Sequence, residues 1–248
     1  MTWLAALMAA VYDEGMGPYA ILARNLETVR ERIAAAAERS GRRPSAVTLV
    51  AVSKYVDADV TRALIRAGAT DIGESRPQQL WHKAEALAYL APRWHMIGHV
   101  QRNKAERTAP LLAYFHSCDS LRLMTKIAQA RSRHAGAPLP ALIEINVSGD
   151  ETKHGFEVDQ AVAALDHALA LQGFNVRGLM AMSGIDSDSL QARREFAALR
   201  ELRDRLLAKG YPAASLHELS MGMTRDFEAA IEEGATMVRI GSALFEGV

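Results

Sequence analysis

The chain has few of the features that mark several large classes of protein. A single cysteine, Cys118, excludes an internal disulfide and fits a reducing compartment. The 29 lysines and arginines balance 29 aspartates and glutamates, so no positive excess indicates nucleic acid or a membrane surface as a partner. No Walker glycine loop and no Gly-x-Ser-x-Gly elbow is present. These absences predict a cytoplasmic globular protein that binds neither nucleic acid nor membranes.

Long hydrophobic runs and metal-ligand motifs are also scarce. The apolar segment at residues 3–11 lacks a basic stretch before it and is too short to span a bilayer. We interpret residues 1–18 as an extension with an extra apolar helix and residues 19–248 as one domain. No cysteine–histidine cluster and no helical His-Glu-x-x-His pattern occurs. His95 and His99 should diverge along a strand, so we expect no metal site.

Strand-like and helix-like segments alternate through the rest of the chain. Eight β units with helices between them, in about 250 residues, are typical of a single α/β domain folded as a (β/α)8 barrel of the TIM type. A doubly wound open sheet competes with this fold, but Ser53-Lys54 stands where such a sheet carries a glycine-rich turn. The predicted strands are residues 47–53, 70–73, 94–98, 114–118, 141–147, 175–181, 216–220 and 236–240.

Three residues have the type and position of helix N-caps. Asp57 precedes a predicted helix that ends at Gly68, and Asp188 precedes a longer helix with an apolar stripe. Thr224 is predicted to cap a short helix after the seventh strand. A further helix, at about residues 20–40, is predicted to precede the first strand.

A lysine follows the most apolar strand-like run. Residues 47–52 read as a buried strand, and Lys54 comes after one serine. Desolvation behind apolar faces would disfavour the ammonium form and leave the amine available to attack a carbonyl, which is the usual requirement for a Schiff-base lysine. The alternative is a lysine at a strand end that keeps its charged head in water.

Small and hydroxyl-bearing residues follow the last two predicted strands. A barrel commonly binds phosphate in these two loops, on backbone N–H groups at a helix start, and hydroxyls add donors. The alternative is an ordinary capped helix together with a turn glycine. We favour phosphate binding because both loops carry the pattern. The candidate residues are Ser220, Gly222, Thr224, Gly241 and Ser242.

A lysine that traps carbonyls and a phosphate cup would lie at one barrel mouth. Together they indicate a ligand that carries an aldehyde and a phosphate. Pyridoxal 5′-phosphate is the obvious candidate. The lysine of a phosphosugar aldolase, which needs no cofactor, is the rival interpretation.

Several blocks of sequence, in order along the chain, carry a family resemblance. They are residues 50–54, 73–74, 94–104, 143–156, 177–180, 219–227 and 235–241. In these blocks the chain resembles the YggS/PROSC-type pyridoxal phosphate homeostasis proteins, whose barrel is like the N-terminal domain of alanine racemase. The blocks run from about residue 20 to the end, so the resemblance rests on many motifs.

The resemblance implies a fold-type III barrel that binds pyridoxal 5′-phosphate. It implies that Lys54 holds the cofactor as an internal aldimine and that Arg239 faces the pyridine nitrogen. Asn146 and Met180 match positions around the ring. One departure falls close to the cofactor, because Ser75 stands where the family usually has asparagine.

The resemblance also covers the phosphate positions. Ser220, Gly241 and Ser242 match phosphate-binding residues, with Met223 and Thr224 nearby. Ser242 replaces a common threonine and keeps its hydroxyl.

The residues and the resemblance together favour a cofactor carrier over an enzyme. Arginine is a donor that stays protonated, so Arg239 would keep the pyridine nitrogen unprotonated and the ring a weaker electron sink. We also expect no second domain after the eighth strand to bring an acid or base to the other face of a ligand. We therefore expect a pyridoxal phosphate homeostasis protein that serves apo pyridoxal-phosphate enzymes without robust turnover. An amino-acid racemase and a cofactor-free Schiff-base aldolase are the alternatives.

Overall fold

The computed structural model of the protein describes residues 18–134, 136–150, 154–184 and 187–248. Almost all of the extension predicted for residues 1–18 therefore lies outside the described part of the chain. No helix among the described residues is long and apolar enough to cross a membrane.

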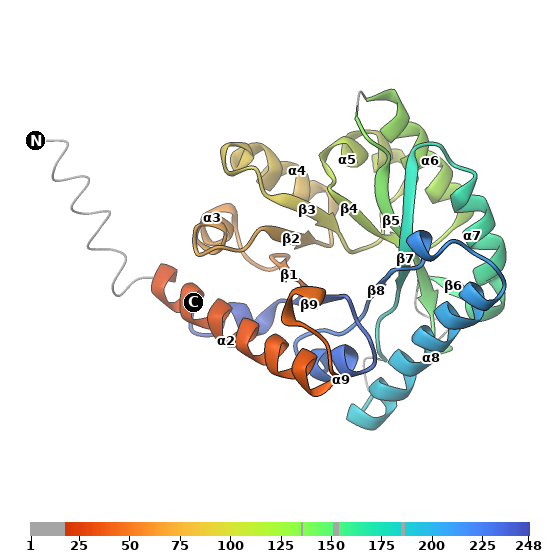
Figure 1. The fold of residues 1–248 in the computed structure, drawn as a ribbon. Helices are drawn as coiled ribbons and strands as arrows, with labels where there is room; N and C mark the ends of the chain where they lie inside the picture. Colours follow the sequence, from red (N-terminus) through yellow and green to blue (C-terminus); the bar gives the residue numbers. More distant parts are fainter. Residues whose placement is uncertain (1–17, 135, 151–153, 185–186) are drawn as a thin grey trace, which may run out of the picture.

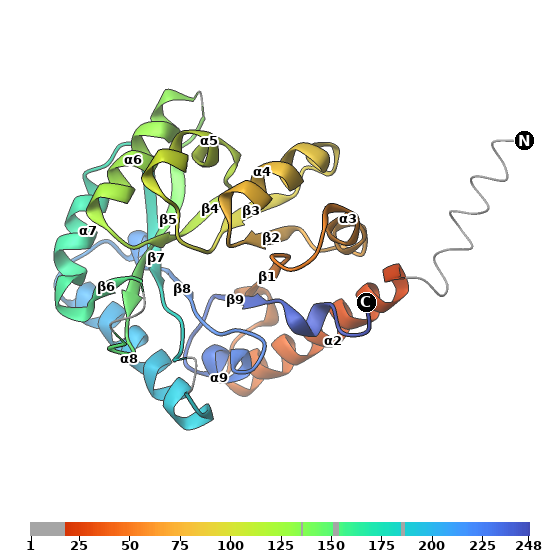
Figure 2. The ribbon, with the colours of Figure 1, turned by 180° about the vertical axis from the view of Figure 1, so that it is seen from behind.

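Eight parallel strands close into a barrel, with helices on its outside (Figures 1 and 2). The strand order is β4-β3-β2-β1-β9-β8-β7-β5, and a β4–β5 pairing completes the ring. This confirms the predicted (β/α)8 barrel and rules out the open sheet. The strands are β1 Thr48–Val52, β2 Asp71–Glu74, β3 Arg93–Met96, β4 Tyr114–Cys118, β5 Leu139–Asn146, β7 Phe174–Met180, β8 Glu218–Ser220 and β9 Met237–Ile240.

All eight strands lie where the sequence predicts them, and one short strand was not predicted. Strand β6, Phe156–Glu157, pairs with the end of β5 outside the barrel ring. Two residues are too few to give a periodic signal in the sequence.

Helices connect successive strands and cover the barrel (Figure 1). The helix before the first strand is present as α2. The α-helices are α2 Pro18–Arg39, α3 Ala58–Arg66, α4 Pro77–Ala86, α5 Ala105–Thr108, α6 Leu121–Arg133, α7 Ala161–Leu169, α8 Ser189–Ala208 and α9 Phe227–Glu232. Short 3-10 helices are η1 Pro44–Ala46, η2 Ala88–Leu90, η3 Arg102–Lys104, η4 Ala109–Leu111, η5 Val158–Gln160, η6 Ala213–Ser215 and η7 Ser242–Leu244.

Two of the three predicted N-caps are confirmed. The Val60 N–H donates to Asp57 Oδ1 at 2.9 Å, at the start of α3. The Gln191 N–H donates to Asp188 Oδ1 at 2.8 Å, at the start of α8. Each carboxylate satisfies a backbone donor that the first helical turn leaves free.

The prediction that Thr224 caps α9 is wrong. The helix begins at Phe227, and Asp226 occupies the N-cap position. Asp226 Oδ1 accepts the Met223 N–H at 2.6 Å, which closes a turn before the helix and delays its start. The Thr224 hydroxyl instead accepts the Gly241 N–H at 3.3 Å. Thr224 thus joins the loops that follow β8 and β9.

The core has two layers. Between the strands and the helices lies a large apolar cluster, which includes the predicted stripe of α8 and the buried Cys118. Inside the ring lies a small apolar group of Tyr114, Leu142, Met180 and Met237. Because alternate residues of a strand point inward, the remaining inward positions hold the barrel's polar groups.

Candidate functional site

Lys54 lies at the C-terminal end of β1, where barrel enzymes place their functional residues. Its side chain is exposed, and its ammonium lies 4.8 Å from the centre of the exposed Tyr55 ring. The expectation that Lys54 is desolvated is therefore wrong in this structure. The strand ends at Val52 and the chain turns at once, which carries the lysine out to solvent.

A different lysine occupies the buried position behind β1. Lys83 of α4 is only 1% exposed and pairs with Glu74 of β2, which is fully buried. Its ammonium also donates to the Ser53 carbonyl at 2.7 Å and lies 3.4 Å from the Ser53 hydroxyl. That hydroxyl donates to Glu74 Oε1 at 3.0 Å. Lys83 therefore anchors Ser53, the residue before Lys54. Its ammonium is held in hydrogen bonds and an ion pair, so its amine is not available to attack a carbonyl.

Arg239 of β9 lies inside the barrel and is 3% exposed. Its guanidinium donates to Ser220 Oγ at 2.6 Å and to the Ala181 carbonyl at 2.8 Å. No carboxylate among the described residues forms an ion pair with it. Arg239 pairs in register with Val50 of the neighbouring β1, four residues before Lys54. The arginine and the lysine thus belong to adjacent strands of one barrel mouth.

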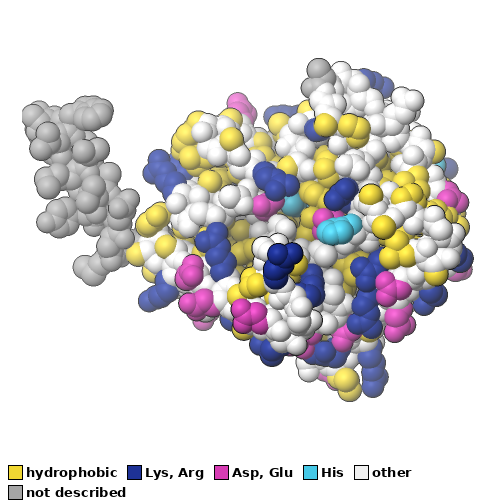
Figure 3. Space-filling view, viewed as in Figure 1, with side chains coloured by type: hydrophobic (Ala, Val, Ile, Leu, Met, Phe, Trp, Pro, Cys, Tyr) yellow, Lys and Arg dark blue, Asp and Glu magenta, His cyan; other side chains and the backbone are white. Residues whose placement is uncertain are grey.

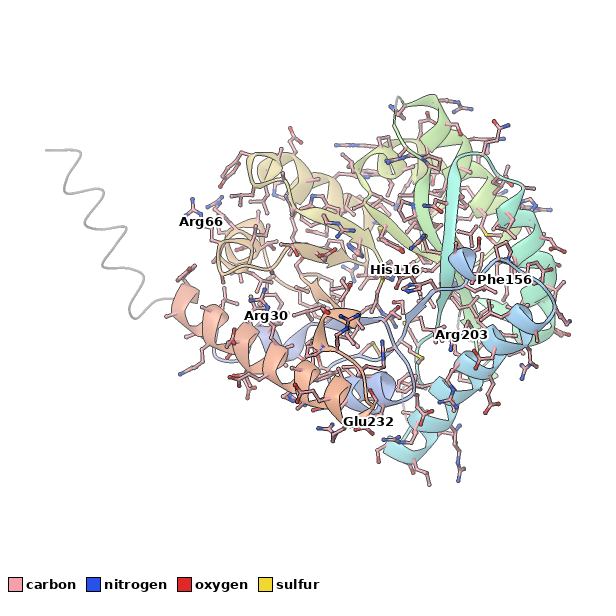
Figure 4. All side chains as sticks on the ribbon, in the orientation of Figure 1. Arg30, Arg66, His116, Phe156, Arg203 and Glu232 are labelled. Atoms are coloured by element: carbon pink, nitrogen blue, oxygen red, sulfur yellow. The ribbon has the colours of Figure 1, made fainter. Side chains whose placement is uncertain are left out.

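A buried chain of side chains links Arg239 to the other end of the barrel. Asp71 Oδ1 lies 2.9 Å from His95 Nε2, and His95 Nδ1 lies 2.9 Å from His116 Nε2. His116 Nδ1 lies 2.9 Å from Ser220 Oγ, next to Arg239. Figure 4 shows the labelled His116 in the middle of the barrel.

The two ends of this chain fix the direction of every hydrogen bond in it. Asp71 can only accept, so His95 donates from Nε2 and accepts at Nδ1. His116 then donates from Nε2 and accepts the Ser220 hydroxyl proton at Nδ1. Ser220 keeps its lone pair for Arg239. Both imidazoles are neutral in this arrangement.

The pKa values along the chain agree with this assignment. Burial lowers the pKa of His95 despite the opposing bond to Asp71. Burial, with the repulsion that a protonated His95 would add and the charge of Arg239, holds the pKa of His116 well below its usual value. Burial acts to raise the pKa of Asp71, but the hydrogen bonds from His95 and Thr70 and the electrostatic attraction of His95 and Arg93 together outweigh it, and the pKa is lowered. Burial lowers the pKa of Arg239 to about 10, so the guanidinium stays protonated at neutral pH.

The predicted phosphate residues lie in the two loops after β8 and β9, with one difference. Ser242 is exposed at the start of η7, and Met223 is 38% exposed. Gly222 has a φ of +89°, and a Cβ there would lie 2.5 Å from the Ala230 Cβ, so only glycine fits. The Ser220 hydroxyl, however, is fully buried and already bonded to His116 and Arg239. The Ser220 hydroxyl therefore accepts a hydrogen bond from Arg239 and does not face the open loop.

The two residues predicted around the ring both lie on the inside of the barrel. Met180 is fully buried in the inner apolar group. Asn146 is 5% exposed, and its amide donates to the Asp150 carbonyl at 3.0 Å and accepts from Ser148 Oγ at 3.0 Å. Asn146 therefore shapes the loop after β5. Contact of either residue with a cofactor ring stays a prediction.

A buried carboxyl group near Arg239 was missed in the sequence. Glu144 of β5 is 4% exposed. Burial and the nearby charge of Asp119 raise its pKa from 4.5 to about 7, with a partial offset from Arg239. Strand alternation places Glu144 on the inner face between Leu142 and Asn146, which could have identified it. The barrel thus holds a carboxyl group that titrates near neutral pH.

We expect Glu144→Gln to remove a pH dependence of stability. The folded state keeps the Glu144 proton to higher pH than the unfolded chain, so this contribution is complete below about pH 4.5 and is lost as the pH rises to about 7. The shift corresponds to a loss of about 3 kcal/mol. Urea unfolding from pH 5 to pH 8 should therefore show a smaller decrease for Glu144→Gln than for the wild type.

The control for this experiment is Glu201→Gln, at an exposed glutamate of α8. It should follow the wild-type profile. A wild type and a Glu144→Gln variant whose stabilities change in parallel with pH would show that Glu144 titrates normally.

The structure also gathers side chains that the sequence did not connect. His99, Asp119 and His154 come from three different loops, and their possible metal-ligand atoms lie within 4.8 Å of one another. His95 and His99 diverge as predicted, one inside the barrel and one at its rim. The expectation of no metal site stays a prediction, although three possible metal ligands meet among the described residues. Figure 3 shows histidine surface beside acidic and basic side chains near the centre of this face.

An open groove of about 830 Å³ lies beside the barrel mouth rather than in it. It runs between the segment after β3 and helix α6 and shares His99 with the cluster. Its charged lining is mostly basic: Arg102, Arg122, Lys126, Arg133 and Glu106. The predicted lysine and phosphate residues do not line this groove.

Comparisons with known proteins agree with the fold and the motifs. The family model of the alanine racemase N-terminal domain matches residues 24–247. A pyridoxal phosphate homeostasis protein of Aquifex aeolicus is 41% identical, over 89% of this chain and 95% of that protein. The crystal structure of an unknown protein from Bifidobacterium adolescentis is 36% identical, with a TM-score of 0.84 over 92% of this chain and 95% of that one.

A further solved structure contains the cofactor. PipY of Synechococcus elongatus, with pyridoxal phosphate bound, is 30% identical, with a TM-score of 0.79 over 90% of this chain and 99% of that one. The family-model match over residues 24–247 spans all eight barrel strands. The chain therefore belongs to the pyridoxal phosphate homeostasis protein family, whose barrel is that of the alanine racemase N-terminal domain.

Proposed function

We propose that this protein binds pyridoxal 5′-phosphate and acts in intracellular homeostasis of the cofactor as a reservoir or carrier. The observation that carries the proposal is the placement of an exposed lysine and a buried arginine on adjacent strands, β1 and β9, of one barrel mouth. The family relationship supports the same ligand. Pyridoxal phosphate supplies an aldehyde that condenses reversibly with a primary amine, and we assign Lys54 as that amine.

Several features of the described residues fit this ligand. Arg239 is a buried cation that has donors but no ion-paired carboxylate in the described part of the chain, so it suits an uncharged acceptor such as a pyridine nitrogen. The hydrogen-bond chain from Asp71 ends on Ser220 beside the guanidinium, and burial lowers the pKa of His95 and His116 so that both stay neutral. An arginine opposite the nitrogen keeps that nitrogen unprotonated, which disfavours stabilisation of a carbanion. This electronic effect supports storage and transfer of the cofactor over amino-acid chemistry.

The phosphate group is assigned to the loops after β8 and β9. Thr224 and Gly241 tie these loops together, and the exposed Ser242 begins η7 beside them. Ser242 would donate its hydroxyl proton to the phosphate, with backbone N–H groups near Gly222 and Gly241 and the neighbouring Met223 completing the cup. Ser220 contributes indirectly because its hydroxyl orients Arg239.

We expect Ser242→Ala to weaken binding of pyridoxal phosphate and to leave binding of unphosphorylated pyridoxal almost unchanged. A charge-assisted hydrogen bond contributes about 1.5–3 kcal/mol, which is about 10- to 100-fold in affinity. Equilibrium titration of both ligands measures the difference. Ser189→Ala, at an exposed serine of α8, is the matched control. Equal weakening for both ligands would remove Ser242 from the phosphate site.

Transfer of the cofactor is the experiment that tests the proposed function. Holoprotein is mixed with an apo pyridoxal-phosphate enzyme, and the regained activity of that enzyme is followed over time. The same holoprotein is assayed for racemisation of a panel of amino acids. We expect activation of the apo enzyme and negligible racemisation. Racemisation of any amino acid at about 1–10³ per second, the range of ordinary enzymes, would replace the carrier by the racemase alternative.

The absorption spectrum of the purified protein distinguishes a cofactor carrier from a cofactor-free aldolase. A carrier that holds pyridoxal phosphate on Lys54 absorbs in the visible range after reconstitution. An aldolase that uses Lys54 directly would show no such band and would cleave a phosphosugar without added cofactor.

A further inference from the structure

Three potential metal ligands converge at the rim of the barrel. His99 follows β3, Asp119 follows β4, and His154 lies between β5 and β6. His99 Nδ1 lies 2.5 Å from Asp119 Oδ2, and His154 Nδ1 lies 4.0 Å from the same oxygen. Both imidazoles therefore present the same nitrogen to one carboxylate.

Asp119 lacks a partner that a buried carboxylate needs. Its side chain is 4% exposed, whereas those of His99 and His154 are 42% and 61% exposed. Asp119 Oδ1 is buried and accepts no hydrogen bond from any described residue. A buried polar atom without a partner is costly, and native structures generally satisfy such atoms with a protein group, a water molecule or an ion. Asp119 Oδ1 therefore needs a hydrogen-bond donor or a cation that the described residues do not supply.

We propose that His99, Asp119 and His154 form a binding site for a divalent transition-metal ion of the zinc type. Two imidazole nitrogens and one carboxylate are a ligand set that zinc and its neighbours use in proteins. Ligands at 2.0–2.1 Å in tetrahedral geometry lie about 3.3 Å apart. The separations to Asp119, 2.5 and 4.0 Å, bracket that value, and all three ligand atoms lie within 4.8 Å of one another, so side-chain shifts of up to about 1.5 Å would admit the ion.

A bound metal ion accounts for the unpartnered Asp119 oxygen and for the orientation of His154, whereas a His99–Asp119 hydrogen bond alone accounts for neither. The His99 and His154 rings are stacked, with centroids 4.5 Å apart and planes inclined by 10°. A simple His99–Asp119 pair satisfies Oδ2 only, and it gives no reason for His154 to face the same carboxylate. A bound cation would compensate the whole carboxylate and use both imidazoles. Three protein ligands also leave at least one coordination position for water or for a ligand at the mouth.

The test uses full-length protein free of any affinity tag, titrated with Co²⁺ and followed by visible absorption, and with Zn²⁺ followed by calorimetry. We expect one equivalent to bind at micromolar metal, with protons released to the buffer, because a metal ion displaces protons from its histidine ligands. These readouts do not involve pyridoxal phosphate, so their result is independent of the proposed function.

Substitutions decide whether the binding is at this cluster. His154→Ala is the decisive variant because the side chain is exposed and its removal should not affect folding. We expect it and His99→Ala each to weaken binding at least tenfold. His217→Ala is the matched control, because His217 lies 3.2 Å from Glu218 and no third ligand joins them among the residues that the structure describes. Absence of stoichiometric binding at micromolar metal, or binding that His154→Ala leaves unchanged, overturns the proposal.

Discussion

Lys54→Ala is expected to abolish the visible absorption band of the reconstituted protein and the adduct that borohydride fixes to the chain. Lys54 is the exposed amine at the end of β1, and Lys83, the other lysine near that strand end, is buried and paired with Glu74. Because Lys54 is exposed, its truncation should change the free energy of unfolding by less than about 0.5 kcal/mol. Loss of the band would therefore show that the amine which binds the cofactor is gone, and not that the protein has unfolded.

The measurement is an absorption spectrum before and after borohydride, followed by mass spectrometry of the reduced peptide. Lys209→Ala, at an exposed lysine after α8, is the control and should keep the full band. A Lys54→Ala protein that retains both the band and the reduced adduct, now at another lysine, would refute the assignment of Lys54.

The barrel could be read from the sequence because its strands are short apolar runs separated by capped helices. The carboxylates of Asp57 and Asp188 confirm that local capping rules operate here without help from the rest of the fold. Thr224 shows the limit of such rules. Asp226, two residues later, closes a turn with Met223 and takes over the N-cap position, and only the folded loop decides between the two.

The polar interior could not be predicted from local patterns. His95 and His116 lie on strands that read as ordinary half-apolar runs, and their partners are 24 and 104 residues away in sequence. Strand alternation places them inside the ring but does not reveal that Asp71 and Ser220 complete one chain of hydrogen bonds. The same holds for the cluster of His99, Asp119 and His154, which the pairing of β3 with β4 and of β4 with β5 brings together.

Burial of individual lysines was the least predictable feature. The apolar strand before Lys54 left two interpretations, a desolvated lysine and a lysine with its charged head in water, and the chain turns outward there, as in the second. Lys83 lies on an amphipathic helix, where a lysine normally reaches water. It is buried because Glu74 and the Ser53 carbonyl offer acceptors under α4, and neither is visible as a pattern in sequence.

Lys83→Met is expected to be strongly destabilising. It removes the ammonium that neutralises Glu74 and satisfies the Ser53 carbonyl, and it leaves a fully buried carboxylate unpaired. Breaking one side of a buried ion pair costs about 3–5 kcal/mol. For a chain of this length that corresponds to a decrease in Tm of roughly 6–20 °C. Urea unfolding at neutral pH measures the free energy directly.

A double substitution shows whether Lys83→Met lowers stability by breaking the ion pair or only by loss of packing. Glu74→Gln combined with Lys83→Met removes both charges, and it should recover much of the stability that Lys83→Met alone loses. Arg133→Met is the control, because Arg133 and its partner Glu106 are 62% and 56% exposed and such a pair contributes less than about 1 kcal/mol. If Lys83→Met is no more destabilising than Arg133→Met, the buried pair does not hold the end of β1. If the double variant is as stable as the wild type but binds pyridoxal phosphate more weakly, the pair instead serves to position Lys54 through the Ser53 backbone.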